Sequence, residues 1–369
     1  MRRSNMRLTL SRLFAEDAAL TMSELVERTG LSRRTLELIL VELVAEGWAE
    51  EITPDVPRGV GRPPRSYAFR PEHALVAAVQ VDSYAANAVV CDLHARVLVR
   101  RRRVLSDVDD PARTYAEVVE MLQAVEADAR PIGPIAAIGF TSGGSFTADG
   151  ELLSLIGSPR WSHQRPAEVL GARFEVPVVA DNDANLAAVA ERHLGAAQDA
   201  PTFLWLVAGK RAGAGILIND AVHHGFDGAA GEIVHAPQLG ASSIATHPFG
   251  VLASPFPEDV ARATELLAAA RAGDEAVLAQ LDDFAALLGG VVAILCWTIA
   301  PPLFVLGGGL GAASDVLLPR LERELSGSPF ARPELRRTSL GDDAALLGAV
   351  LAARTRVGGD LRDAFDLRD

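Results

Sequence analysis

Residues 177–194, PVVADNDANLAAVAERHL, place a strand, a polar loop and a helix in immediate succession. The apolar run from Pro177 to Ala180 is typical of a short buried strand, and Leu186 to Leu194 has the pattern of a helix. Between them stands Asp181-Asn-Asp-Ala-Asn185. The stretch therefore predicts an α/β unit with carboxylates and amides where a strand gives way to a helix.

The chemistry of this loop allows two interpretations. A carboxylate at such an exit can accept a proton from a sugar hydroxyl, and an adjacent amide can both donate and accept hydrogen bonds. Asp and Asn are also good helix N-caps. The motif alone favours neither role.

Other apolar runs, each beside a glycine or acidic loop, alternate with helical segments over the rest of residues 71–369. The expected strands are 75–81, 88–91, 96–99, 135–140, 203–207 and 303–306. This alternation predicts an α/β body.

The arginines at 100–103 are interpreted as a solvated strand end rather than a DNA contact. The uncharged stretch 284–314 is long enough to prompt a membrane-span interpretation, but Gly289-Gly290, Pro301-Pro302 and the glycines at 307–309 divide it into a helix, a turn, a strand and a loop.

Residues 1–70 have a different pattern, with three helices followed by two strands. A short helix, 22–29, ends at Gly30, and Ser32 can cap a longer helix that ends at Gly47. Residues 48–52 and 65–69 are predicted strands, and 53–64 would form a wing between them. The pattern is typical of a winged helix-turn-helix, in which the second helix of the pair enters the major groove.

Arginine side chains at the start of a recognition helix suit guanine or phosphate, and an arginine in a wing can enter a narrow minor groove. The expected DNA contacts are Ser32, Arg33, Arg34 and Thr35 at the helix start and Arg58, Arg62 and Arg65 in or beside the wing. A small protein-interaction module with solvated arginines would show a similar pattern.

The charge is unevenly distributed. Residues 1–70 hold 11 arginines and 10 acidic residues, for a net charge of +1, whereas the remainder holds 24 basic and 38 acidic residues, for a net charge of -14. Only residues 1–70 are therefore suited to approach nucleic acid. A composition of 49% hydrophobic and 22% charged residues indicates a folded, soluble protein.

Cysteine content and the N-terminal residues bear on the compartment. Two cysteines, Cys91 and Cys296, exclude a disulfide framework and an all-cysteine metal cluster, and residues 1–30 contain no secretory signal pattern. A cytoplasmic protein without a membrane span is expected.

Several motifs resemble those of the ROK family (repressor, open reading frame, kinase). In the first seventy residues they are Thr29-Gly-Leu-Ser32, Leu43-Val-Ala-Glu-Gly47 and Gly61-Arg-Pro-Pro64; in the body they are Asp181-Asn-Asp-Ala-Asn185 and Gly228-Ala-Ala-Gly-Glu-Ile-Val-His235. The resemblance covers nearly the whole chain. It implies a winged helix-turn-helix, residues 1–70, followed by an actin-like, sugar-kinase-like body of two lobes, residues 71–369.

The same resemblance implies a sugar site in the body. Asp183 matches the family's catalytic base, and Asn182 its neighbouring asparagine. Glu232 and His235 match the glutamate and histidine that line the family's sugar site, and Gly143 matches a glycine that lies against the sugar. With these neighbours, sugar contact is favoured over a capping role for the loop at 181–185.

The chain departs from the family where phosphate and zinc bind. The first phosphate loop of the kinases, Asp-x-Gly-Gly-Thr, is here Asp82-Ser-Tyr-Ala-Ala86, and the second, Gly209-Lys-Arg-Ala-Gly-Ala-Gly215, has Arg211 in place of a glycine. Tyr84 would obstruct the close backbone approach that phosphoryl transfer needs. No cysteine follows His235 where the family's zinc ligands lie. Neither a catalytic residue, a metal nor another cofactor is therefore expected.

These observations predict a transcriptional regulator of carbohydrate metabolism, a repressor, that binds double-stranded operator DNA as a homodimer or a dimer of dimers. A sugar or sugar phosphate in the cleft would act as the effector. Two alternatives stay open: a ROK-type sugar kinase, and a repressor controlled by a protein partner with a vestigial sugar cleft.

Overall fold

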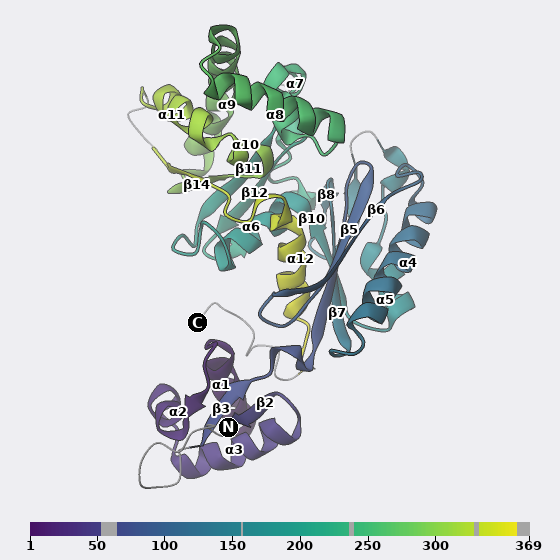
Figure 1. The fold of residues 1–369 in the computed structure, drawn as a ribbon, viewed down its shortest axis with the longest axis vertical. Helices are drawn as coiled ribbons and strands as arrows, with labels where there is room; N and C mark the ends of the chain where they lie inside the picture. Colours follow the sequence, from purple (N-terminus) through teal and green to yellow (C-terminus); the bar gives the residue numbers. More distant parts are fainter. Residues whose placement is uncertain (53–64, 156–157, 236–239, 328–331, 360–369) are drawn as a thin grey trace.

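The computed structural model describes residues 1–52, 65–155, 158–235, 240–327 and 332–359, and the elements gather into a head and two lobes (Figure 1). The head contains α1 (Arg2–Phe14), β1 (Leu20–Thr21), α2 (Met22–Thr29), α3 (Arg33–Ala45), β2 (Ala49–Ile52) and β3 (Ser66–Phe69). The first lobe contains β4 (Leu75–Val81), β5 (Ala85–Cys91), β6 (Val97–Val104), α4 (Pro111–Ala129), β7 (Ile135–Ser142), β8 (Ser145–Phe146), β9 (Leu152–Ser154), α5 (Pro166–Phe174) and β10 (Val178–Asn182). α6 (Asp183–His193) leads to the second lobe, which contains β11 (Phe203–Ala208), β12 (Ala212–Ile218), β13 (Ala221–Val222), α7 (Ala241–Thr246), α8 (Pro257–Arg271), α9 (Glu275–Ile299), β14 (Leu303–Leu306), α10 (Gly308–Ala312), α11 (Ser314–Leu325) and β15 (Glu334–Arg337), and α12 (Ala344–Arg354) returns to the first lobe.

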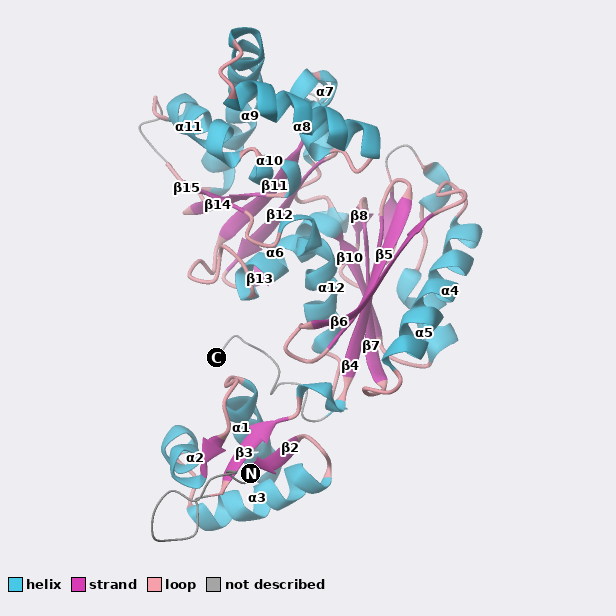
Figure 2. Ribbon diagram, viewed as in Figure 1, coloured by secondary structure: helices cyan, strands magenta, loops and turns pink. Residues whose placement is uncertain are grey.

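Local capping chemistry sets the helix boundaries in the head. Thr21 and Glu24 form a reciprocal capping box at the start of α2, and Gly30 ends that helix in the left-handed conformation at φ 67°. Ser32 caps α3 by accepting a hydrogen bond from the Thr35 amide at 3.2 Å. The strands pair antiparallel in the order β1-β3-β2 and cover the helices (Figure 2).

The two lobes repeat one topology. In the first, β4, β5 and β6 form an antiparallel meander, and β7 and β10 add in parallel on the other side of β4. In the second, β11, β12 and β13 form the meander, and β14 and β15 add in parallel beside β11. This arrangement confirms the predicted α/β fold with a two-lobed body.

Helices α6 and α12 lie between the two sheets (Figure 1). α12 packs on β4 and β7, α6 packs on β11 and β12, and the two helices pack against each other. Buried residues of α6 and α12 belong to one continuous hydrophobic cluster with the core of the head. The body is therefore connected to the head by shared packing as well as by the chain.

The long apolar stretch differs in part from its prediction. α9 continues through Gly289-Gly290 without a break; at Gly289 an added Cβ would lie 2.9 Å from the Glu324 side chain, so the glycine allows α11 to pack closely there. The turn and the strand β14 follow as predicted, but the glycines at 307–309 open the short helix α10 rather than a loop. Of the described helices, α9 is the one long and apolar enough to span a membrane by length and composition; nine of its residues are buried in the second lobe.

The arginine run lies inside β6 and not beyond the end of that strand. Its side chains alternate between the two faces: Arg100 pairs with Asp343 and Arg102 with Tyr84 on one, while Arg101 pairs with Asp128 and Arg103 with Glu120 on the other. β6 is an edge strand. Charged side chains of this kind protect an edge from pairing with another chain.

Candidate functional site

The start of α3 presents the predicted DNA-contacting residues in two groups. Ser32 and Thr35 bond to each other, with their hydroxyl oxygens 2.9 Å apart, so both side chains help to form the helix cap. Arg33 and Arg34 are exposed, and the Arg33 guanidinium donates to the Glu37 carboxylate at 3.3 Å. Such an exposed i, i+4 pair contributes little to stability. Both arginines are therefore available to another partner.

The same helix exposes two apolar side chains that the sequence did not single out. Leu38 is 64% exposed and Val41 is 71% exposed, although the helix buries Leu36 and Leu40 on its other side. Exposed aliphatic groups beside arginines on one helix face suit the major groove, where thymine presents its methyl group.

The wing arginines are only partly described. Arg65, just before β3, forms an ion pair with Glu51 of β2, with its Nε 3.2 Å from the carboxylate. Arg58 and Arg62 lie outside the described residues, and their contact with DNA stays a prediction.

A cavity of about 470 Å³ opens between the two lobes. Gly143 and Asn182 of the first lobe line it, as does Asp183 at the start of α6. Glu232 lines it from the second lobe. The side chains at the ends of β4, β7 and β10 meet there because the C-terminal ends of parallel strands share one edge of the sheet. Four of the five predicted sugar-binding residues are thus brought together.

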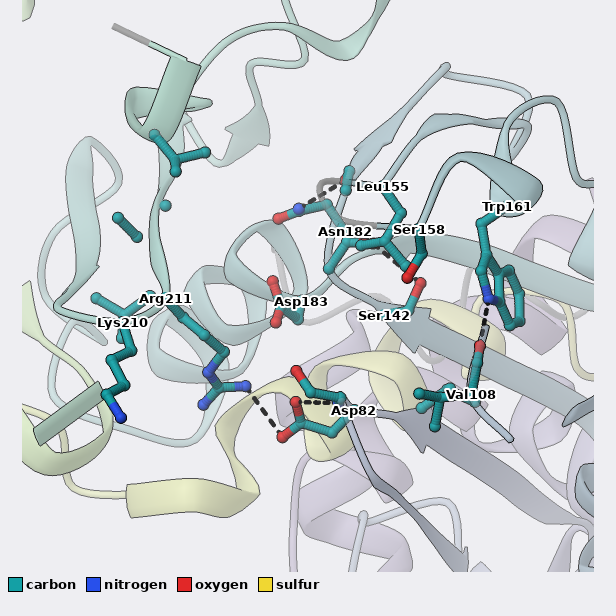
Figure 3. Close-up of a pocket in the computed structure, with 18 of the residues that line it drawn as sticks. Asp82, Val108, Ser142, Leu155, Ser158, Trp161, Asn182, Asp183, Lys210 and Arg211 are labelled. Carbon is teal, nitrogen blue, oxygen red and sulfur yellow. Dashed lines mark hydrogen bonds and ion pairs between the residues drawn. The ribbon is translucent and has the colours of Figure 1, made fainter. Parts of the chain in front are cut away.

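The sequence left open whether the loop at 181–185 caps a helix or contacts a ligand, and Asn182 and Asp183 are placed differently in this respect. Asn182 is the N-cap of α6: its side-chain oxygen accepts from the amides of Ala184 and Asn185 at 2.8 and 3.1 Å, and its side-chain nitrogen donates to the Gly144 carbonyl at 2.9 Å. Asp183 follows as the first residue of the helix, and its carboxylate faces the cavity (Figure 3). The capped helix therefore holds the Asp183 carboxylate in a fixed position.

The cavity is acidic. Burial raises the pKa of the Asp183 carboxyl, the Arg211 guanidinium opposes that shift, and the charge of Asp82 adds to it. Burial, and then the charge of Asp183, raises the pKa of the Glu232 carboxyl to about 7. A carboxyl with that pKa exists in both protonation states near neutral pH, so it can donate or accept a hydrogen bond with a ligand hydroxyl.

Arg211 and Lys210 are the basic side chains among the described residues that line this cavity, and both are paired with acids. Arg211 comes from the turn between β11 and β12 and reaches across the cleft to Asp82, which follows β4, with Nη1 3.1 Å from the carboxylate (Figure 3). Lys210 donates to both oxygens of Asp259 at 2.7 Å. The ion pair between Arg211 and Asp82 therefore joins the two segments that correspond to phosphate loops in the ROK kinases.

A second cavity, of about 510 Å³, adjoins the first, and Asp82, Asp183 and Arg211 line both. Tyr84 also lines it and stacks on Phe256, with 5.3 Å between ring centroids. Tyr84, within the segment that corresponds to the first phosphate loop, thus contacts Phe256 of the second lobe.

His235 does not join the other predicted sugar-binding residues. His235 is exposed and is not part of the cavity wall, although Glu232 and Val234 just before it are. A different histidine, His224, contacts the loop at 181–185: its Nε2 donates a hydrogen bond to the Asp181 carboxylate at 2.8 Å. This hydrogen bond raises the pKa of His224. That bond joins the second lobe to the loop at 181–185.

The residues downstream of His235 do not fit a zinc site. His247 Nδ1 accepts a hydrogen bond from the Phe249 amide at 3.1 Å, and Cys296, the cysteine of the second lobe, is buried in α9. Four ligands in a tetrahedral array are needed, and the donors present do not supply them. Within the described residues no cluster of three or more histidine, cysteine or acidic side chains could hold a metal ion.

Other cavity residues carried no signal in the sequence. Trp161 and Ser158 come from the segment after β9, and Phe256 precedes α8. The Trp161 indole donates to the Val108 carbonyl at 2.6 Å, which fixes the ring against the cavity (Figure 3). An isolated tryptophan or phenylalanine has no local pattern that separates a ligand contact from a core residue, so only the fold could identify them.

Comparison with known proteins gives two kinds of relative. The chain is 22% identical to the xylose repressor of Bacillus subtilis over 366 residues, which cover 94% of both proteins. It is 32% identical to a glucokinase of Halalkalibacterium halodurans over 206 residues, 47% of this chain and 62% of the enzyme, so that alignment spans less than two thirds of the enzyme's length.

A solved structure described as a ROK family transcriptional regulator, a homologue of the Escherichia coli MLC protein, superimposes with a TM-score of 0.73 at 18% identity and covers 99% of this chain and 96% of the other. That likeness shows that the fold of head and body together is shared. Residues 76–246 and 243–356 match the sequence model of the ROK family. Because these segments span most of the chain, the protein belongs to the ROK family.

Proposed function

We propose that this protein is a cytoplasmic, DNA-binding transcriptional repressor whose operator affinity responds to a sugar. The observation that carries the proposal is that one chain joins a helix with exposed Arg33 and Arg34 to a cleft in which Asp183 and Glu232 face a cavity of sugar size. The likeness to the xylose repressor over nearly the whole chain supports it. In this proposal two heads of a homodimer bind a palindromic operator.

The charges of the cleft suggest the class of sugar. Lys210 and Arg211 are already paired, whereas Asp183 and Glu232 face the cavity. A phosphate group would meet like charge there and would have to displace an existing ion pair. We therefore propose an unphosphorylated sugar, whose hydroxyls can bond to both carboxyls and to the Asn182 amide.

The DNA-binding half is tested by selecting duplexes from a random library with the full chain and measuring affinity for the selected operator. We expect Arg34→Ala to weaken operator binding by about 1–3 kcal/mol, because the guanidinium would contact a base edge. Arg113→Ala is the matched control: it removes one exposed arginine from α4, far from the head, and should leave affinity unchanged. Equal losses in the two variants would contradict the assignment of α3.

A sugar kinase is the second candidate, and the match to a glucokinase favours it. Asp183 is present, but Arg211 and Tyr84 stand at the phosphate loops, and backbone amides cannot surround a phosphate there without moving both. Coupled ATP turnover with a panel of hexoses distinguishes the candidates. We expect no turnover above a blank; sugar-dependent turnover that disappears in Asp183→Ala would establish the kinase instead.

A repressor that responds to a protein partner is the third candidate. It predicts selective operator binding together with an unchanged unfolding midpoint across the sugar panel. A sugar present at one hundred times its dissociation constant raises the free energy of unfolding by about 2.7 kcal/mol. A higher unfolding midpoint with one sugar would therefore exclude a vestigial cleft.

A further inference from the structure

The cleft and the head are connected by two helices in direct backbone contact. α6 begins at Asp183 in the cavity wall and packs along α12. At their crossing a Cβ atom on Gly348 would collide with the backbone of Leu186, so no side-chain layer separates the helices. A displacement of α6 must therefore move α12, since close-packed backbones cannot slide past each other without repacking.

α12 ends on the head. Its last residue, Arg354, is only 4% exposed although it is charged. The guanidinium donates to the Leu93 carbonyl at 3.0 Å and stacks over the ring of Phe14, with Cζ 5.2 Å from the ring centroid. Phe14 is the last residue of α1, so the Arg354 side chain joins α12 both to the turn between β5 and β6 and to the head.

Further contacts hold Phe14 in place. His94, in the turn between β5 and β6, donates from Nε2 to the Phe14 carbonyl at 2.9 Å, and the ring of Phe69 packs edge-on against Phe14 with 5.3 Å between centroids. Arg96 pairs with Asp17 just beyond α1. The end of α1 is thus attached to the body on one side and to the end of α12 through Arg354.

We infer that Arg354 is the positioning residue that couples the sugar cleft to the head: a shift of α6 and α12 on sugar binding moves the guanidinium, which reorients α1. The inference rests on the proposed function. It requires that the two arrangements of the α6–α12 pair differ in sugar affinity and in head position, because coupling is a difference in free energy between states.

The test compares full-length Arg354→Lys with wild type and with Arg356→Lys, which alters an exposed arginine two residues further along the chain. Lysine keeps the charge and a donor but loses the planar group that stacks on Phe14. D-glucose, D-xylose and N-acetyl-D-glucosamine are the probes, and the readout is the ratio of operator Kd with and without sugar. In wild type and in Arg356→Lys we expect a ratio within about 5 to 150-fold, and in Arg354→Lys a ratio below about 2-fold with an unchanged rise of the unfolding midpoint by sugar.

A wild-type ratio in Arg354→Lys would overturn the inference. Should Arg354→Lys not fold, Phe14→Leu removes the same stacking contact while it keeps an apolar side chain, and the same ratios apply.

If no probe changes operator affinity in wild type, the proposed function fails, and the inference is judged separately from amide hydrogen exchange. Faster exchange in α1 of Arg354→Lys, with α6 unchanged, supports the attachment; unchanged exchange in α1 overturns it.

Discussion

At the scale of single residues, the cleft is lined by four carboxyls, those of Asp82, Asp109, Asp183 and Glu232, and by two basic side chains, those of Lys210 and Arg211. Asp82 is paired with Arg211, while Asp183 and Glu232 share a partly buried space: burial raises the pKa of both carboxyls, and the charge of Asp183 raises the pKa of Glu232 further. A sugar hydroxyl can replace water around these carboxyls, whereas a phosphate would add to the negative charge. The arrangement is one for recognising hydroxyl groups.

Glu232 gives this account a pH dependence. Folding raises the pKa of its carboxyl from 4.5 to about 7, so the folded state holds the proton more tightly than the unfolded state does. Below the unfolded pKa this group therefore adds no pH dependence to the free energy of unfolding. As the pH rises from about 5 to 7, the free energy of unfolding falls. We expect Glu232→Gln, which cannot titrate, to lose less free energy of unfolding over that interval than wild type.

Urea unfolding at a series of pH values measures this difference. Glu258→Gln, at an exposed position of α8, is the control and should follow the wild-type curve. Parallel curves for wild type and Glu232→Gln would show that the Glu232 carboxyl is not perturbed by the cavity.

At the scale of elements, α3 combines a polar helix start with an exposed apolar face. Leu38 and Val41 are largely exposed and belong to none of the hydrophobic clusters of the described chain. If α3 enters the major groove, these side chains approach thymine methyl groups. They would then contribute to base preference, while Arg33 and Arg34 contribute hydrogen bonds.

Replacing thymine by deoxyuridine in the selected operator tests this role, because it removes one methyl group and no hydrogen-bonding atom. We expect wild type to lose about 4-fold in affinity at a contacted thymine, corresponding to ~0.8 kcal/mol for a buried methyl. Leu38→Ala or Val41→Ala should bind the two operators equally. Val44→Ala, further along the helix, serves as the control and should keep the wild-type difference; a loss that is the same in all four proteins would exclude the contact.

The elements were predictable where their signals are local. Caps at Thr21, Ser32 and Asn182, the glycine at the end of α2 and the apolar runs of β4, β7 and β14 are encoded within a few residues, and the structure has those elements close to their expected bounds. β12 and β15 were not predicted, because β12 is rich in glycine and alanine, and β15 is short and charged. Such strands are specified by their neighbours in the sheet rather than by propensity.

The candidate site was predictable to a similar degree and for a similar reason. The loop at 181–185 and Glu232 lie in motifs, so their chemistry could be recognised before their positions were known. The ion pair of Asp82 with Arg211 joins residues 129 positions apart, and no local pattern links them. His235 matched a motif in spacing, but it is exposed and does not line the cavity.

At the scale of the whole molecule, the head and the body share one hydrophobic cluster while they differ in charge. The head has a net charge of +1, with exposed arginines on α3, and the body has a net charge of -14. DNA is therefore expected to contact the head and to be repelled by the body. A small reorientation of the head would change how two heads of a dimer fit adjacent major grooves, which is how a sugar in the cleft could alter operator affinity.

The most direct test of this account is operator affinity of the full-length protein, measured by fluorescence anisotropy with and without saturating D-glucose, D-xylose or N-acetyl-D-glucosamine, in wild type and in Asp183→Ala. We predict that at least one of these sugars changes the wild-type Kd by about 5-fold or more, and that Asp183→Ala binds the operator as tightly as unliganded wild type but no longer responds. An Asp183→Ala protein that responds to the sugar as wild type does would contradict the assignment of the cleft as the sensor.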